Sequence, residues 1–303
     1  MTHPLPDRLR RNVSLYFGER GLRWLAGLEE RLPDLARAYD LHILPPFPDL
    51  SINYVAPAVR SDGTDVVLKL GVPNPEIDGE IASLRAFGGS GAVRLLEADP
   101  ESGLLLLERV RPGSSLRDLS EEEATRAAAG VIARLHRSDI LPDPTLPRLE
   151  DWFEAFARHR SRFGGSGPLP HRLLDRAEST ARELLASTDR PILLHGDLHH
   201  DNVLAGTREP WLAIDPKGVA GVPCFEVAPF MRNPMSTLHT ADNLGPLLQR
   251  RFALFHEHLG YDIDRMQAWV VAESVLSALW DIDDPEEGWR RSLVIAEEVA
   301  RWE

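Results

Sequence analysis

The sequence has a single cysteine, Cys224, and no all-aliphatic run longer than the four leucines at 104–107 in its 303 residues. One cysteine excludes an intrachain disulfide and a cysteine-rich zinc site. Four leucines are far short of the ~20 apolar residues that cross a bilayer. Residues 1–11 are polar and proline-bearing, without the apolar segment of a signal peptide. We therefore expect a cytoplasmic protein that does not associate with a membrane.

Positive charge is also in short supply. The chain carries 34 Lys and Arg against 47 Asp and Glu, which gives a formal net charge of −13 and a pI near 5.3. Proteins that bind a phosphate backbone usually carry a basic stripe, so this balance argues against a nucleic-acid partner. Residues 261–303 hold eleven acidic and four basic side chains, and such a surface would attract a cationic substrate.

Lysine is the scarcest of the charged residues, because only Lys69 and Lys217 occur and the other basic residues are arginine. A compact ammonium differs from a planar guanidinium in the sites that it suits, so the two lysines mark positions of interest. Neither stands in the Gly-Lys-Ser/Thr context of a Walker A loop. This excludes a P-loop enzyme.

Hydrophobic spacing in the first third of the chain changes from helical to strand-like. Apolar residues at helical spacing predict helix over 7–40, with Pro33 starting a second helix within this stretch. β-Branched and aromatic residues on both sides of a turn at 61–64 predict a hairpin. The predicted elements are strands at 51–59, 65–70, 92–97 and 103–108, and a helix at 75–87.

The segment Arg-Pro-Gly-Ser-Ser at 111–115 is the best candidate for a domain boundary. Beyond it only 192–194 and 211–214 resemble strands, and helical patterns cover 120–136, 149–162, 171–185, 240–258, 265–280 and 286–302. The predicted fold class is α+β. It has an N-terminal lobe, residues 1–110, with a helical extension over 1–45, and a mostly helical C-terminal lobe, residues 111–303.

The densest polar segment, residues 195–204, lies between two predicted strands. Asp197 precedes Asn202 by five positions, and Asp215 follows the second strand. One carboxylate can take the proton of an acceptor hydroxyl, while an amide oxygen and a second carboxylate hold Mg²⁺ against phosphates. This spacing alone is common. Its histidines also suggest a zinc hydrolase, since His195 and His199 are four apart, but that spacing loses its meaning in a loop.

The N-terminal lobe supplies a second pattern. Lys69 ends a predicted strand, and Glu80 follows eleven residues later on the next helix. A strand lysine paired with a helix glutamate holds the α- and β-phosphates in kinases. Glu76 competes as the partner, but Pro75 makes it a first-turn residue that faces the helix dipole. Together with Asp197, Asn202 and Asp215, this order indicates a kinase.

These residues and their neighbours resemble the protein-kinase-like antibiotic phosphotransferases, specifically the aminoglycoside/hydroxyurea resistance kinases that include streptomycin 6-kinases. The resemblance runs through 51–56, 67–70, 91–96, 106–109, 194–199, 214–218 and 225–234. His-Gly-Asp-Leu-His at 195–199 marks the broad superfamily. Asp-Pro-Lys-Gly at 215–218 and Arg-Asn-Pro at 232–234 point to the narrower branch.

The resemblance implies a two-lobe protein-kinase-like fold, with an antiparallel sheet in the N-terminal lobe and ATP and Mg²⁺ bound in the cleft. It implies Asp197 as catalytic base, Asn202 and Asp215 as metal ligands, and Lys69, steadied by Glu80, on the ATP phosphates. Lys217 would neutralise the transferring phosphate, with a salt bridge to Glu226 as the alternative.

The resemblance also bears on adenine and on the phosphate loop. The linker Glu108–Val110 would offer backbone groups to adenine. The first predicted hairpin lacks the Gly-x-Gly-x-x-Gly of protein kinases, since Gly63 is its only glycine. The phosphates would therefore be met by backbone groups and by Ser51, Asn53 or Tyr54.

The acceptor site is expected at the end of the penultimate helix, where Trp280, Asp281, Asp283 and Asp284 cluster. Carboxylates at a helix C-terminus are disfavoured by the dipole, which suggests a cationic partner. Glu226 is a further candidate for substrate contact. The predicted reaction is ATP-dependent phosphorylation of a small cationic hydroxylated compound, with streptomycin at its 6-hydroxyl first.

The alternatives keep the fold and change the activity. The acceptor could be hydroxyurea, an amino alcohol or a sugar, because the acceptor pocket has no spacing code. A nucleotide-binding module without turnover is a third interpretation, which the presence of all five machinery residues disfavours. The sequence does not predict an oligomeric state.

Overall fold

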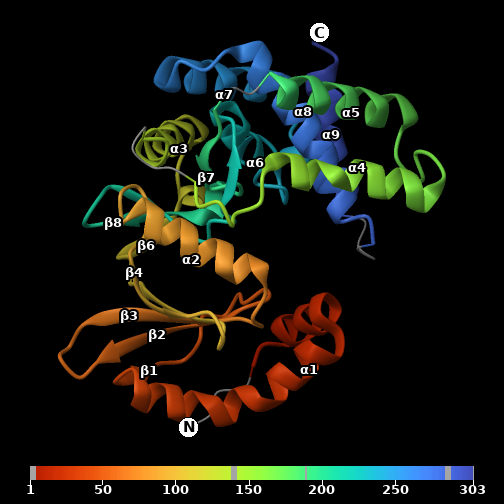
Figure 1. The fold of residues 1–303 in the computed structure, drawn as a ribbon. Helices are drawn as coiled ribbons and strands as arrows, with labels where there is room; N and C mark the ends of the chain where they lie inside the picture. Colours follow the sequence, from red (N-terminus) through yellow and green to blue (C-terminus); the bar gives the residue numbers. More distant parts are fainter. Residues whose placement is uncertain (1–4, 138–141, 188–189, 284–287, 303) are drawn as a thin grey trace. The chain divides into compact units, whose positions relative to one another are not determined.

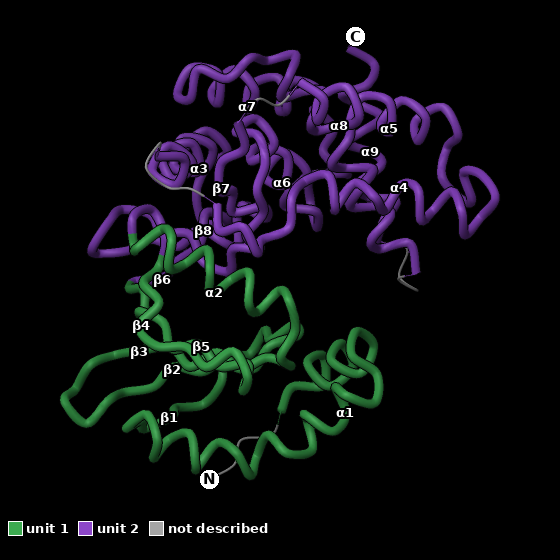
Figure 2. Tube along the Cα trace, in the orientation of Figure 1, with its two compact units in different colours: residues 1–89, 93–111 green, residues 90–92, 112–303 purple. Residues whose placement is uncertain are grey.

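A computed structural model describes residues 5–137, 142–187, 190–283 and 288–302. The chain divides into two compact units, coloured separately in Figure 2. Unit 1 comprises residues 1–89 and 93–111, and unit 2 comprises residues 90–92 and 112–303. In the described part of the chain, no helix is both long enough and apolar enough to span a membrane.

Unit 1 contains a five-stranded antiparallel sheet with the order β1-β2-β3-β5-β4. The strands are β1 Leu41–Ile43, β2 Tyr54–Arg60, β3 Asp65–Leu70, β4 Leu95–Asp99 and β5 Leu104–Glu108. The predicted hairpin is confirmed as β2–β3, with Asp65 opposite Val59. The predicted helical extension to residue 45 is wrong at its end, because residues 41–43 pair with residues 58–60 as an edge strand.

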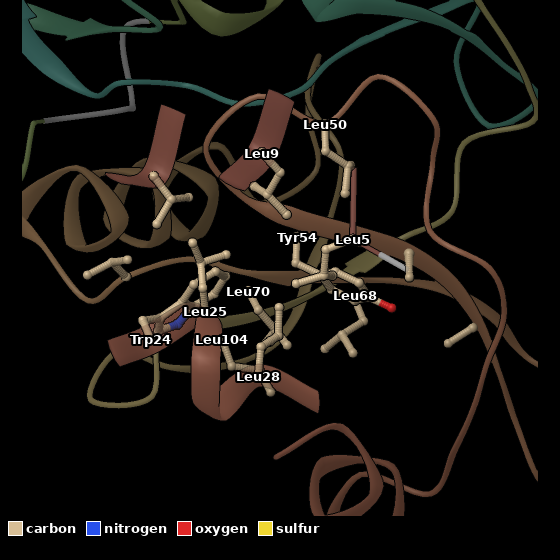
Figure 3. Packing of buried hydrophobic residues seen from close by; sticks show 14 of the residues in the cluster. Leu5, Leu9, Trp24, Leu25, Leu28, Leu50, Tyr54, Leu68, Leu70 and Leu104 are labelled. Carbon is tan, nitrogen blue, oxygen red and sulfur yellow. The ribbon is translucent and has the colours of Figure 1, made fainter. Parts of the chain in front are cut away.

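One face of this sheet is covered by helix α1, Asp7–Ala38. Strand side chains alternate between the two faces, so Val66, Leu68 and Leu70 of β3 all point toward α1. Figure 3 shows Leu9, Leu25 and Leu28 of α1 packed with Leu68, Leu70 and Leu104. Lys69 lies between two of these core residues in sequence and therefore faces the other side of the sheet.

Helix α1 breaks at Gly18, which has φ 52° and ψ −137°, a left-handed conformation that glycine adopts easily. The prediction of a second helix starting at Pro33 is wrong, since Pro33 lies inside the continuing helix. Gly21, three residues after the break, is buried against the carbonyl of Val13, where a Cβ would come within 2.4 Å. The break and this close approach together fold the two parts of α1 against each other.

Replacing two glycines of α1 by alanine is expected to change the free energy of unfolding in opposite directions. Gly18→Ala places a Cβ at a positive φ and should lower the free energy of unfolding by about 1–2 kcal/mol. Gly27→Ala lies in regular helix, where a Cβ meets nothing within 4 Å, and should raise it by about 0.5–1 kcal/mol. Urea denaturation of both variants measures the difference. Equal effects would contradict the left-handed backbone at Gly18.

The second face of the sheet carries helix α2, Pro75–Phe87, on the side away from α1 (Figure 1). The sequence predicted these bounds, and the caps explain them. The Asn74 side chain accepts a hydrogen bond from the N–H of Glu76, and Gly88 ends the helix in a left-handed conformation. This helix holds Glu80 over the sheet, and Glu80 is buried.

Unit 2 is mostly helical, as predicted. Its helices are α3 Glu121–Leu135, α4 Leu149–Phe163, α5 His171–Ala186, α6 Ala228–Met231, α7 Leu244–Leu259, α8 Ile263–Trp280 and α9 Trp289–Ala300. Its strands are β6 Pro112–Ser115, β7 Ile192–Leu194, β8 Val203–Gly206, β9 Trp211–Ala213 and β10 Val219–Gly221. The sequence missed β6, β8 and β10, because three or four residues rich in Gly, Ala and Ser carry no readable alternation.

Residues 90–92 join unit 2 although the residues on both sides belong to unit 1. The N–H of Ala213 in β9 donates to the carbonyl of Gly91 at 2.8 Å, and Ala92 forms a parallel bridge with Ala213. The guanidinium of Arg208 donates to the carbonyl of Ala92. This short segment thus completes the edge of the sheet that carries β8 and β9.

Candidate active site

In unit 1, Lys69 and Glu80 form a buried ion pair. The distance from Lys69 Nζ to the Glu80 carboxylate is 2.8 Å, and the residues are 2% and 5% exposed. The structure therefore confirms Glu80 over Glu76 as the partner of Lys69. Removing either charge alone would leave the other buried without compensation. This would lower the free energy of unfolding by about 3–5 kcal/mol.

The candidates for phosphate contact in unit 1 lie before β2. The Asn53 side chain packs against Gly71, because a Cβ added at Gly71 would come within 2.4 Å of Asn53 Oδ1. The exposed Ser51 hydroxyl accepts a hydrogen bond from Asn12. Tyr54 is 4% exposed and belongs to the core facing α1, so the expectation that its side chain meets phosphate is wrong. The roles of Ser51 and Asn53 stay predictions.

The candidate adenine linker follows β5. The N–H of Glu108 donates to the carbonyl of Arg94 at 2.9 Å, and the Glu108 carboxylate accepts from the N–H of Arg94. The N–H of Glu108 is thus engaged within unit 1. That the other backbone groups of Glu108–Val110 contact adenine stays a prediction.

In unit 2, His195 joins the loop after β7 to the loop after β9. Its Nε2 bonds the carbonyl of Ile214 at 2.8 Å, and its Nδ1 accepts from the N–H of Asp197. Its carbonyl accepts from the N–H groups of Lys217 and Gly218. Gly196, directly before Asp197, turns the loop with φ 82°, a left-handed conformation.

Two further hydrogen bonds connect the loop of Asp197 with the segments that carry the two expected metal ligands, Asn202 and Asp215. Asn202 Nδ2 donates to the Asp197 carbonyl at 2.9 Å, and the N–H of Ile214 donates to the Asn202 carbonyl at 2.9 Å. Asp215 follows directly, with φ 57°, a left-handed conformation that is rare for residues other than glycine and common at functional positions. An amide oxygen and a carboxylate are hard oxygen donors, so this pair fits Mg²⁺.

The histidines of this loop do not assemble a zinc site. Both ring nitrogens of His195 are engaged by backbone groups. The His200 ring stacks on Phe230 with centroids 4.1 Å apart, and burial lowers its pKa to about 2. Within the described ranges, no group of three or more His, Cys, Asp and Glu side chains could hold a metal ion.

The side chain of Glu226 is 0% exposed, and its hydrogen bonds support the loop that carries Asp197. Its two carboxylate oxygens accept from the N–H groups of His195, at 2.7 Å, and Gly196, at 2.9 Å. Its expected contact with substrate is therefore wrong, since the side chain is closed to solvent. Burial alone would raise the pKa of Glu226, but the bond from His136 Nε2 at 3.1 Å and the backbone donors lower it, so the group is a carboxylate.

Arg232 and Glu273 are two residues of the site that sequence reasoning missed. Arg232 Nε donates to both oxygens of Glu273, at 2.9 and 3.1 Å, and Arg232 Nη2 lies 3.8 Å from Asp197 Oδ1. Burial would lower the pKa of Arg232, but Glu273, Asp197 and Asp281 together raise it. A readable signal existed, because Glu273 is the one charged residue in the apolar run 266–280 of α8.

The residues predicted to contact the acceptor at the end of α8 have different surroundings in the structure. Trp280 is 47% exposed and meets Trp152 edge to face, with centroids 5.4 Å apart. Trp152 in turn packs on Gly196, where a Cβ would come within 2.8 Å of it. Asp283 already has a cation, because Arg162 donates to both its oxygens at 2.7 and 2.8 Å. Asp284 lies outside the described residues.

Comparison with known proteins gives consistent matches. The profile of the aminoglycoside/hydroxyurea antibiotic resistance kinases matches residues 50–285. Streptomycin 6-kinase of Streptomyces glaucescens is 35% identical over 285 residues, which cover 92% of this chain and 91% of that protein. Hydroxyurea phosphotransferase of Kitasatospora aureofaciens is 38% identical over 274 residues, 89% of this chain and 78% of that protein. The solved structure of an amicoumacin kinase in complex with AMP-PNP and Ca²⁺ has a TM-score of 0.61 at 15% identity, covering 93% and 96%.

The structural match confirms the predicted α+β, protein-kinase-like fold. The sequence matches confirm that the chain is a phosphotransferase that acts on a small molecule. The paired Lys69 and Glu80 and the braced Asp197 loop agree with that chemistry. The chain belongs to the aminoglycoside/hydroxyurea antibiotic resistance kinase family.

Proposed function

We propose that the protein transfers the γ-phosphoryl group of ATP to a hydroxyl of a small cationic compound, and that the 6-hydroxyl of streptomycin is the acceptor. The observation that carries this proposal is the set of hydrogen bonds that joins Asp197, Asn202 and Ile214, with Asp215 next in the chain at φ 57°. The 35% identity with a streptomycin 6-kinase supports the acceptor. Because ATP is the donor, we assign the reaction to the cytoplasm, where it would inactivate the antibiotic.

In the proposed reaction, the acceptor hydroxyl gives its proton to Asp197 while its oxygen bonds to the γ-phosphorus. The bond from that phosphorus to the β,γ-bridging oxygen breaks, and ADP leaves. Lys69, held by Glu80, neutralises the α- and β-phosphates, and Lys217 neutralises the transferring group. Mg²⁺ held by Asn202 and Asp215 would supply positive charge against the phosphate oxygens. The protein thus contributes position and charge rather than covalent chemistry.

The test is an ADP-release assay with Mg-ATP and a panel of acceptors: streptomycin, other aminoglycosides, hydroxyurea and amino alcohols. We expect ADP release that depends on streptomycin and exceeds the background hydrolysis of ATP. Hydroxyurea is the second candidate, because the hydroxyurea phosphotransferase is 38% identical over 274 residues. Turnover with hydroxyurea alone would keep the kinase and refute the streptomycin assignment.

Asp281 is proposed to contact a cationic group of the acceptor. It caps the C-terminal end of α8, and its charge acts on Arg232, which lies beside Asp197. Asp281→Asn should raise the KM for streptomycin about 10-fold, since a charge-assisted hydrogen bond contributes about 1.5–3 kcal/mol. The KM for ATP should not change. The exposed Glu297→Gln on α9 is the control, and an equal rise in that variant would refute the contact.

A further inference from the structure

The guanidinium of Arg232 is held in one orientation by three different partners. Its Nε donates to both oxygens of Glu273, its Nη1 contacts Met235 Sδ at 3.5 Å, and its Nη2 lies 3.8 Å from Asp197 Oδ1. The last distance is too long for a hydrogen bond. Arg232 therefore acts on the Asp197 carboxylate through its charge and leaves the carboxylate lone pairs open to an acceptor hydroxyl.

Glu273 is the residue that keeps the Arg232 guanidinium 3.8 Å from Asp197 Oδ1. It is 2% exposed and lies in the middle of α8, Ile263–Trp280, where its neighbours on both sides are buried. A carboxylate that is fully desolvated and bonded to one guanidinium nitrogen competes with Asp197 for the same cation. Without this competition, Arg232 would be free to pair directly with Asp197.

We infer that Glu273 is a positioning residue for phosphoryl transfer, because it holds Arg232 beside Asp197 without allowing a direct hydrogen bond to the reacting carboxylate. The inference rests on the proposed role of Asp197 as base. In this arrangement Arg232 places its positive charge 3.8 Å from Asp197 Oδ1, and Glu273 sets how closely the two side chains approach. The pair reaches the reaction only through Asp197, and neither residue needs to touch ATP or the acceptor.

The first test is Glu273→Gln, which keeps the shape of the side chain and removes its charge. We expect kcat to fall about 10- to 100-fold, the range for a misplaced reacting group, while the KM values for ATP and streptomycin change little. Ser274→Ala, at the next and equally buried position of α8, is the matched control and should keep the parent kcat. A Glu273→Gln kcat within about twofold of the parent would overturn the inference, whatever its thermal stability.

The second test separates this role from structural support. Arg232→Met with Glu273→Leu replaces the buried ion pair by apolar side chains, a change that is often neutral or favourable for stability. If Glu273 acts only through Arg232, this double variant should have the kcat of Arg232→Met alone. A double variant with the parent kcat, or one far below Arg232→Met, would overturn the inference.

A failure of the proposed function can be distinguished from a failure of the inference about Glu273. If the parent enzyme turns over neither streptomycin nor any other acceptor in the panel, the proposed function fails. The same ratios of kcat are then measured on the slow hydrolysis of Mg-ATP, in which water is the acceptor. A reduced rate in Glu273→Gln supports the inference in that assay also, and an unchanged rate refutes it.

Discussion

Asp197→Asn is expected to lower kcat for phosphoryl transfer by about 10²–10⁴-fold, the usual contribution of a general base. The substitution keeps the size of the side chain and removes its basicity. The hydrogen bonds that shape the loop use the Asp197 backbone, since its N–H donates to His195 Nδ1 and its carbonyl accepts from Asn202. The loop should therefore keep its form in the variant, and ATP affinity should stay close to that of the parent.

Two measurements check this expectation. The transfer rate is read from ADP release with the acceptor that the parent uses, and ATP affinity from calorimetric titration of the variant with Mg-ATP. The exposed Asp118→Asn in the same unit controls for the loss of a carboxylate at a distance. Near-normal turnover in Asp197→Asn or Asp197→Ala would refute the base assignment, and loss of ATP binding would show a role in the loop itself.

Glu226→Gln is expected to lower the free energy of unfolding by about 3–5 kcal/mol, the range for removing one partner of a buried charged network. The carboxylate accepts from two backbone N–H groups and from His136 Nε2. A Gln side chain has one accepting oxygen and turns its own N–H₂ toward donors. At least one buried donor would then lack an acceptor, which adds a desolvation cost.

Urea denaturation followed by circular dichroism measures this loss. Because the N–H groups of His195 and Gly196 directly precede Asp197, we also expect a lower kcat in the folded fraction. Glu226→Asp keeps the charge on a shorter side chain and should lose less stability than Glu226→Gln. A loss below about 1 kcal/mol in Glu226→Gln, the value of an ordinary neutral hydrogen bond, would contradict the bracing role.

The elements with strong local signals were predictable from the sequence. Helix α2 has Asn74 and Pro75 at its start and Gly88 at its end, and its bounds follow from these three residues. In α1, the sequence pattern indicates a break at Pro33, whereas the structure has it at Gly18. Proline is tolerated where its missing N–H and fixed φ suit the backbone, whereas a left-handed glycine leaves no mark on the hydrophobic pattern.

The site was predictable where its residues are close in sequence. Asp197, Asn202 and Asp215 lie within nineteen residues, and their spacing predicts phosphoryl-transfer chemistry once Lys69 and Glu80 are added to the pattern. Glu226 is 31 positions from the N–H of His195, and Glu273 is 41 positions from Arg232. Such pairs are made by the packing of separate elements, and no local spacing rule specifies them. The buried charges in apolar surroundings were the available signal.

The short segment at residues 90–92 determines how this protein can be dissected. A fragment that begins at Pro112 would leave the N–H of Ala213 without the Gly91 carbonyl, and the Arg208 guanidinium without the carbonyl of Ala92. A fragment that begins at Ser90 would keep these bonds but take β4 and β5 away from β3. No single cut of the chain therefore yields two complete units. Split versions of the enzyme would need a duplicated segment 90–92 on the C-terminal fragment.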